Sequence, residues 1–136
     1  MNGKYLLDTN TVISFLGKDD KTVKILSEIE EIYVPVTVIG ELYFGAFKSK
    51  KVKENLKAIS SFMDKIPILE NNKSTARLYG EIKNQLKKKG KPIPENDIWI
   101  ASVAKQYGLK LITNDIHFKE IDNLQLYFPL EDEIMQ

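Results

Sequence analysis

KYLLDTNTVISFL, at residues 4–16, joins a short apolar run to one acid and then to a second apolar run. We expect Lys4–Leu7 to form a buried strand and Thr11–Leu16 a short apolar helix, with Asn10 as its N-cap. Asp8 is the only charged residue of this stretch after the initial lysine. The pattern therefore predicts a strand–helix unit with a carboxylate at its junction.

The rest of the chain repeats this alternation of short apolar runs and helical periods, which predicts an α/β fold with a parallel sheet of about five strands. At 136 residues, with no linker or internal repeat, we expect residues 1–136 to form a single domain. The later strands are expected at Ile32–Val36, Ile66–Leu69, Leu109–Thr113 and Leu124–Tyr127. Helices are expected at Lys21–Glu30, at Val38–Phe47 after a Thr37 cap, at Val52–Lys65, at Ser74–Lys89, and from an Asn96 cap to Tyr107.

The composition excludes several kinds of site. The chain has no cysteine, so disulfides, thiolate zinc sites and cysteine nucleophiles are ruled out. With one histidine, His-rich metal sites are not expected, and His117 is interpreted as a surface or packing residue. No apolar run reaches the length of a membrane span and no signal peptide opens the chain, so we expect a cytoplasmic protein.

Four isolated carboxylates stand where a parallel sheet would place its strand ends. Each interrupts a stretch that otherwise reads as core: Asp8, Glu41, Asp97 and Asp115. Burying a bare carboxylate is unfavourable, so a chain that does this repeatedly is expected to gather the acids around a shared cation. Hard oxygen ligands suit Mg²⁺ or Mn²⁺. Taken singly, an ordinary turn or helix-end charge explains Asp8, Asp97 or Asp115 about as well. Glu41 is harder to explain in this way, because no charged neighbour stands near it, and the hypothesis depends on the set.

A divalent ion in such a site can polarise phosphate oxygens and activate a bound water for attack on phosphorus. The inferred reaction is metal-dependent hydrolysis of a phosphodiester. Polar neighbours of the acids could orient metal ligands or hold waters, and these are Asn10, Asn96 and Thr113. Helix capping by the two asparagines, and strand propensity for the threonine, are equally simple explanations.

Lysines gather in two clusters, at residues 48–53 and 83–91. They are either solvated helix ends or a surface that contacts phosphates. Lys50 and Lys51 are the candidates for RNA contact.

Several motifs together resemble those of the PIN-domain ribonucleases, in particular the VapC toxins of prokaryotic toxin–antitoxin modules. The resemblance covers nearly the whole chain, in order. It depends on Leu6-Leu-Asp-Thr-Asn10, the isolated Glu41, Asn96-Asp-Ile-Trp-Ile-Ala-Ser102 and Leu111-Ile-Thr-Asn-Asp-Ile-His-Phe118.

The resemblance implies an α/β/α sandwich and an endoribonuclease that uses Mg²⁺ or Mn²⁺. Asp8 and Asp97 would be direct metal ligands, Glu41 would bind the metal or its waters and help to deprotonate the attacking water, and Asp115 would complete the site. Asn10 and Thr113 match polar positions that line it. The resemblance also implies a homodimer and a cognate VapB-like antitoxin, whose C-terminal segment would block the site.

Three other functions remain open from the sequence. The first is a PIN-domain nuclease of RNA processing without a toxin role. The second is a Mg²⁺-binding, receiver-like signalling domain, although the position after the expected third strand holds Glu70 rather than the aspartate of that class. The third is a binding module without catalytic activity.

Overall fold

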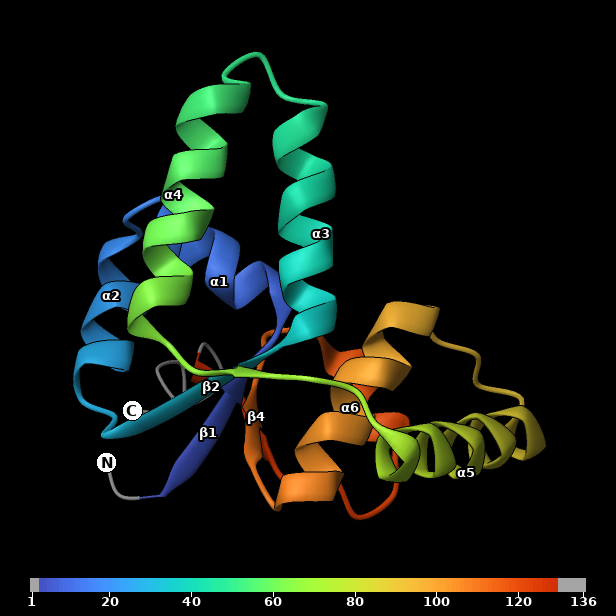
Figure 1. The fold of residues 1–136 in the computed structure, drawn as a ribbon. Helices are drawn as coiled ribbons and strands as arrows, with labels where there is room; N and C mark the ends of the chain where they lie inside the picture. Colours follow the sequence, from blue (N-terminus) through green and yellow to red (C-terminus); the bar gives the residue numbers. More distant parts are fainter. Residues whose placement is uncertain (1–2, 130–136) are drawn as a thin grey trace.

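The computed structural model describes residues 3–129, which fold around one sheet of five parallel strands (Figure 1). The strand order is β3-β2-β1-β4-β5, so the N-terminal strand lies at the centre. The strands are β1 (Lys4–Leu7), β2 (Glu31–Pro35), β3 (Ile68–Leu69), β4 (Lys110–Ile112) and β5 (Leu126–Tyr127). This order differs from the 2-1-3-4-5 order of receiver-type folds, which removes the structural basis for the receiver-like alternative.

Helices cover both faces of the sheet, as an α/β/α sandwich requires (Figure 1). One face of the sheet is covered by α1, α2 and α4, and the other face by α5 and α6. In addition, α4 pairs with α3 in antiparallel orientation, and this pair extends beyond the carboxyl edge of the sheet. The helices are α1 (Thr9–Leu16), α2 (Asp20–Ser27), α3 (Val36–Phe47), α4 (Val52–Lys65), α5 (Lys73–Lys89), α6 (Glu95–Tyr107) and the 3-10 helix η1 (Ile116–Glu120). Within residues 3–129, no helix combines the length and the apolar character that a membrane crossing needs.

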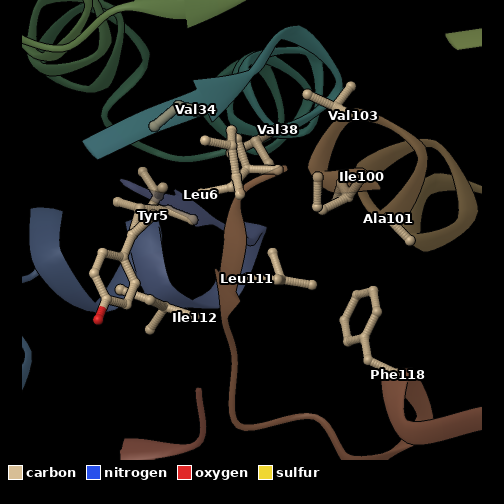
Figure 2. Close-up of a cluster of buried hydrophobic side chains, with 14 of the residues drawn as sticks. Tyr5, Leu6, Val34, Val38, Ile100, Ala101, Val103, Leu111, Ile112 and Phe118 are labelled. Carbon is tan, nitrogen blue, oxygen red and sulfur yellow. The ribbon is translucent and has the colours of Figure 1, made fainter. Parts of the chain in front are cut away.

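The core is built on β1 and its neighbour β4, which are buried on both faces, as strands of a parallel sheet usually are. Leu6 and Leu111 have no exposed surface. Successive side chains of β4 point to opposite faces: Figure 2 shows Leu111 on the side of α6 and Phe118, and Ile112 on the side of Tyr5. This packing fixes the carboxyl ends of β1 and β4 next to each other, with Leu7 in register with Ile112.

Three expected helix caps were wrong. Asp8, not Asn10, caps α1, and α6 begins at Glu95 after Pro94, which places Asn96 inside its first turn. α3 begins at Val36 directly after Pro35 and has no side-chain cap, so Thr37 does not cap it. In α1, the carboxylate at the end of β1 is placed to accept from the free N–H groups of the first turn, so the helix begins before Asn10. In α3 and α6, the fixed φ of the preceding proline starts the helix without a polar cap.

Candidate active site

Asp8 is the most buried of the four acids. It follows β1 directly, and only 4% of its surface is exposed. Its Oδ1 accepts a hydrogen bond of 2.9 Å from the backbone N–H of Thr11, and its Oδ2 accepts one of 2.5 Å from the hydroxyl of Thr113. The positive end of the α1 dipole lies at the same place, which favours a negative charge. The buried carboxylate is therefore held by its surroundings in one orientation.

Thr113 links two of the acids. It is fully buried just after β4. Its hydroxyl donates to Asp8 and accepts a 3.0 Å hydrogen bond from the backbone N–H of Asp115. This side chain therefore ties the strand end that carries Asp8 to the turn that carries Asp115, a role more specific than strand propensity.

Glu41 enters the site from the second turn of α3. Its Oε1 accepts a 2.8 Å hydrogen bond from the hydroxyl of Thr9. Burial raises the pKa of Glu41 above its usual value, the Thr9 hydrogen bond opposes this, and the negative charges of Asp97 and Asp8 add to the rise in pKa. A carboxyl group in this setting holds a proton more readily than an exposed glutamate does.

Asp97 lies in the first turn of α6, and 21% of its side chain is exposed. Burial is the main cause that raises the pKa of Asp97. The hydrogen bond from His117 lowers this pKa, and the charges of Asp115 and Asp8 raise it. The nearby charges of Asp115 and Asp8 and the removal from water both disfavour the ionised form of Asp97. A bound cation would stabilise that ionised form.

Asp115 completes the set from the turn after β4. It caps η1, because its side chain accepts a 3.2 Å hydrogen bond from the backbone N–H of His117. Its Oδ1 also lies 2.8 Å from Nδ1 of His117. The carboxylate is 35% exposed, compared with 21% for Asp97.

The acids line one cleft of about 340 Å³ at the carboxyl edge of the sheet, where ligands of open α/β sheets bind. Asn10 and Asn96, which cap no helix, also line this cleft. The other residues that line it are Asp8, Thr9, Glu41, Pro94, Glu95, Asp97 and Asp115. The structure therefore brings together all four acids and the three polar neighbours expected beside them.

Lys50 and Lys51 are not part of this cleft. They lie in the turn between α3 and α4, at the outer end of that helix pair (Figure 1). Lys50 is exposed, and Lys51 approaches Glu54 at 3.9 Å. A contact of these lysines with a polynucleotide remains a prediction, and it would require a substrate long enough to reach from the cleft to the tip.

His117 is the residue that the sequence did not indicate. Its Nε2 lies 2.6 Å from Oδ2 of Asp97, a contact that the interpretation as a surface or packing residue did not include. The contact joins η1 to α6, and a tertiary contact of this kind leaves no mark in local sequence. The only available signal was the spacing of two residues from Asp115.

The donor set fits a hard divalent cation. Asp97, Asp115 and His117 offer ligand atoms that all lie within 4.8 Å of one another, and the carboxylates of Asp8 and Glu41 line the same cleft. Carboxylate oxygens are the ligands that Mg²⁺ and Mn²⁺ prefer. Where several acids share one cleft, a cation both compensates their charge and satisfies their remaining lone pairs.

A family comparison agrees with this geometry. The PIN domain family model matches residues 5–124. The chain belongs to the PIN domain family. As a PIN domain it contains the matched segment from β1 to the residues before β5, which includes all four acids.

Two curated relatives and one solved structure place this PIN domain more closely. Ribonuclease VapC2 of Haemophilus influenzae is 38% identical over 117 residues, covering 83% of this chain and 87% of that protein. The tRNA(fMet)-specific endonuclease VapC of Shigella flexneri is 28% identical over 125 residues, covering 90% and 95%. The crystal structure of VapBC2 from Rickettsia felis bound to a DNA fragment from their promoter superposes with a TM-score of 0.83 at 32% identity, covering 90% and 96%.

Proposed function

We propose that this chain is a metal-dependent endoribonuclease that uses Mg²⁺ or Mn²⁺ and acts as the toxin of a toxin–antitoxin pair. The observation that carries the proposal is the convergence of Asp8, Glu41, Asp97 and Asp115, from four separate segments, on one cleft. Relatives named ribonuclease VapC support the choice of RNA as substrate.

The residues divide the work by their environment. Asp8, Asp97 and Asp115 would hold the cation. When bound, that ion supplies Lewis-acid polarisation of the phosphate and a lower pKa for the attacking water. Thr113 fixes the orientation of Asp8 by its 2.5 Å hydrogen bond, so this carboxylate need not reorganise when the ion binds.

Glu41 is suited to proton transfer. Its pKa is raised by burial and by the neighbouring acids, and Thr9 holds its Oε1. In the proposed reaction, the oxygen of water bonds to phosphorus, its proton passes to Glu41, and the bond from phosphorus to the leaving oxygen breaks. A carboxylate of raised pKa accepts such a proton better than an ordinary one at neutral pH.

The direct test is cleavage of total cellular RNA by the purified chain. We expect discrete fragments with Mg²⁺ or Mn²⁺, none after chelation, and none from Asp8→Asn or Asp97→Asn. Arg77→Ala, an exposed substitution on α5 away from the cleft, is the matched control and should cleave like the unaltered chain. Cleavage that survives both Asn substitutions would refute the assignment.

The toxin role has its own test, because a PIN-domain nuclease of RNA processing would show the same chemistry. Induced expression of the unaltered chain should arrest growth, and expression of Asp97→Asn should not. Normal growth under expression of an active nuclease would favour the RNA-processing function.

A groove beside the cleft offers a surface for the VapB-like partner. It has a volume of about 350 Å³ between α1, α3 and α4, is lined largely by apolar residues, and shares Glu41 with the cleft. An apolar segment in this groove could present a basic side chain to Glu41 and so block the site. Ala58, on the exposed face of α4, lines the groove. Ala58→Tyr should fill part of the groove without adding a positive charge, so it should abolish co-purification with the antitoxin and leave RNA cleavage unchanged.

The homodimer remains part of the proposal. Tyr43 packs against the core, whereas Phe44 and Phe47 on α3 are 67% and 64% exposed. Aromatic exposure of this extent is typical of a surface that contacts protein. Sedimentation should give a dimer for the unaltered chain and a monomer for Phe44→Asp; a monomer for both would exclude it.

A further inference from the structure

The ring of His117 bridges two of the proposed metal-binding carboxylates. Nε2 lies 2.6 Å from Oδ2 of Asp97, and Nδ1 lies 2.8 Å from Oδ1 of Asp115. The three side chains are only 21–35% exposed. The contact with Asp97 is a hydrogen bond, which is among the stronger ones in proteins when the acceptor is charged, and the contact with Asp115 is a close N···O approach.

We propose that His117 is a positioning residue that holds Asp97 and Asp115 at a fixed separation for the cation. The inference rests on the metal site proposed above. Each carboxylate uses one oxygen for the ring and keeps its other oxygen, Oδ1 of Asp97 and Oδ2 of Asp115, for the ion. The ring thus does for two ligands what the hydroxyl of Thr113 does for Asp8.

The need for such a bridge follows from where the two acids originate. Asp97 is carried by α6, whereas Asp115 stands in the turn after β4. Two like charges brought together by separate elements repel each other, and a donor between them reduces this repulsion while restricting both side chains. Metal sites commonly use groups of this kind to orient their ligands.

The position of His117 is fixed by its neighbour in sequence and by its own backbone. Phe118, the next residue, is only 1% exposed and packs in the core on the side of α6 and Leu111 (Figure 2). The backbone N–H of His117 is also held by Asp115 at 3.2 Å. Because η1 is fixed at both places, the imidazole meets the two carboxylates without further ordering of the chain.

The same contacts argue against direct ligation of the cation by this histidine. A ring nitrogen that binds a metal must present its lone pair to the ion. Both nitrogens of His117 face carboxylate oxygens at hydrogen-bond distance. While these two contacts persist, no ring nitrogen would be available to a metal, and carboxylate oxygens would hold it.

Calorimetric titration of the metal-free protein with Mn²⁺ tests the proposal without relying on activity. His117→Phe keeps a ring of similar size and removes both ring nitrogens, so Mn²⁺ affinity should fall about 10- to 100-fold. His117→Gln places an amide donor near the position of Nε2 and should restore much of the loss. Ile116→Ala, an exposed change on the same short helix, is the control and should bind like the unaltered chain.

The outcomes separate this inference from the function on which it rests. If the unaltered chain binds no Mn²⁺, the proposed metal site itself is wrong. If the unaltered chain binds Mn²⁺ and His117→Phe binds within twofold of it, only the positioning role is refuted. An affinity of His117→Gln as low as that of His117→Phe would also refute it, because the donor would then not matter. Thermal unfolding of each variant confirms that it is folded.

Electron spin-echo spectroscopy of the Mn²⁺-loaded chain distinguishes positioning from ligation. A positioning role predicts no ¹⁴N coupling from a directly bound imidazole. A directly bound ¹⁴N signal that disappears in His117→Phe would show that His117 is a ligand and would overturn the proposal.

Discussion

The hydrogen bond from Thr113 to Asp8 gives the sharpest prediction about how the cleft is built. Thr113→Val keeps the shape of a fully buried side chain and removes the hydroxyl that donates to Oδ2 of Asp8 at 2.5 Å. A hydrogen bond to a charged group contributes about 1.5–3 kcal/mol to stability, because the acceptor left behind is buried. We therefore expect the free energy of unfolding of the metal-free protein to fall by about 2 kcal/mol.

Urea denaturation at pH 7.5, with Thr11→Val as the matched control, measures this effect. Thr11 is also buried, and its hydroxyl donates to an uncharged acceptor, the backbone carbonyl of Ile112, at 3.2 Å. Loss of a neutral hydrogen bond costs about 1 kcal/mol. The Thr113 substitution should thus be the more destabilising of two identical changes.

A double-mutant cycle assigns the difference to the carboxylate. In an Asp8→Asn background, the cost of Thr113→Val should shrink by about 1 kcal/mol, because the acceptor no longer carries a full charge. A cost that is the same in both backgrounds, or a cost of Thr113→Val below about 0.5 kcal/mol, would refute the reasoning.

Three further predictions concern charge in and around the cleft. Burial raises the pKa of Glu41 in the folded chain above its pKa in the unfolded chain. The contribution of this carboxyl group to folding stability is therefore fully present below the unfolded pKa, and it is lost as the pH rises through the folded pKa. Glu41→Gln should consequently raise the melting temperature of the metal-free protein at pH 7.5, with a difference that vanishes near pH 4; a lower melting temperature at pH 7.5 would contradict this. The pKa values of Asp97 and Glu41 are both raised, so protons should compete with the cation at a pH above the usual carboxyl range. Mn²⁺ affinity should therefore decline as the solution is acidified. An affinity that is constant from pH 7.5 to 5 would contradict this. Finally, Lys50→Ala combined with Lys51→Ala should weaken RNA binding more at low than at high salt in a fluorescence-anisotropy titration, whereas an equal loss at both salts would argue against direct phosphate contact.

The sequence was most informative where a charge stood alone. Asp8 and Glu41 each interrupt a long apolar stretch, and this isolation is visible without any structure. The parallel-sheet pattern then predicted that such residues meet at one edge, which the cleft confirms. The strand β1 and the helix α4 have the expected bounds, because an apolar run marks β1 and a regular helical spacing of apolar residues marks α4.

Edge strands and helix starts were harder to predict. β3 and β5 contain two residues each, although the apolar runs around them are longer. An edge strand pairs with one neighbour only, so its length depends on that neighbour and not on its own sequence. Likewise, Asn10 is a good N-cap by type, but Asp8 stands closer to the first free N–H groups once β1 has fixed its position.

The contact of His117 with Asp97 could not be predicted for a related reason. It joins residues separated by 20 positions, from two elements with different neighbours in the fold. Composition and periodicity report the environment of an element, and they contain no information on which side chains of two elements meet. A lone histidine in a turn is ordinarily a surface residue, and here the tertiary fold brings its ring against Asp97.

Anomalous diffraction from crystals soaked in Mn²⁺ tests most directly whether the four acids form one metal-dependent site. We predict a manganese peak in the cleft, within coordination distance of carboxylate oxygens of Asp8 and Asp97, and no such peak in crystals of Asp97→Asn. A manganese peak only outside the cleft, from a chain that cleaves RNA with Mn²⁺, would contradict the account.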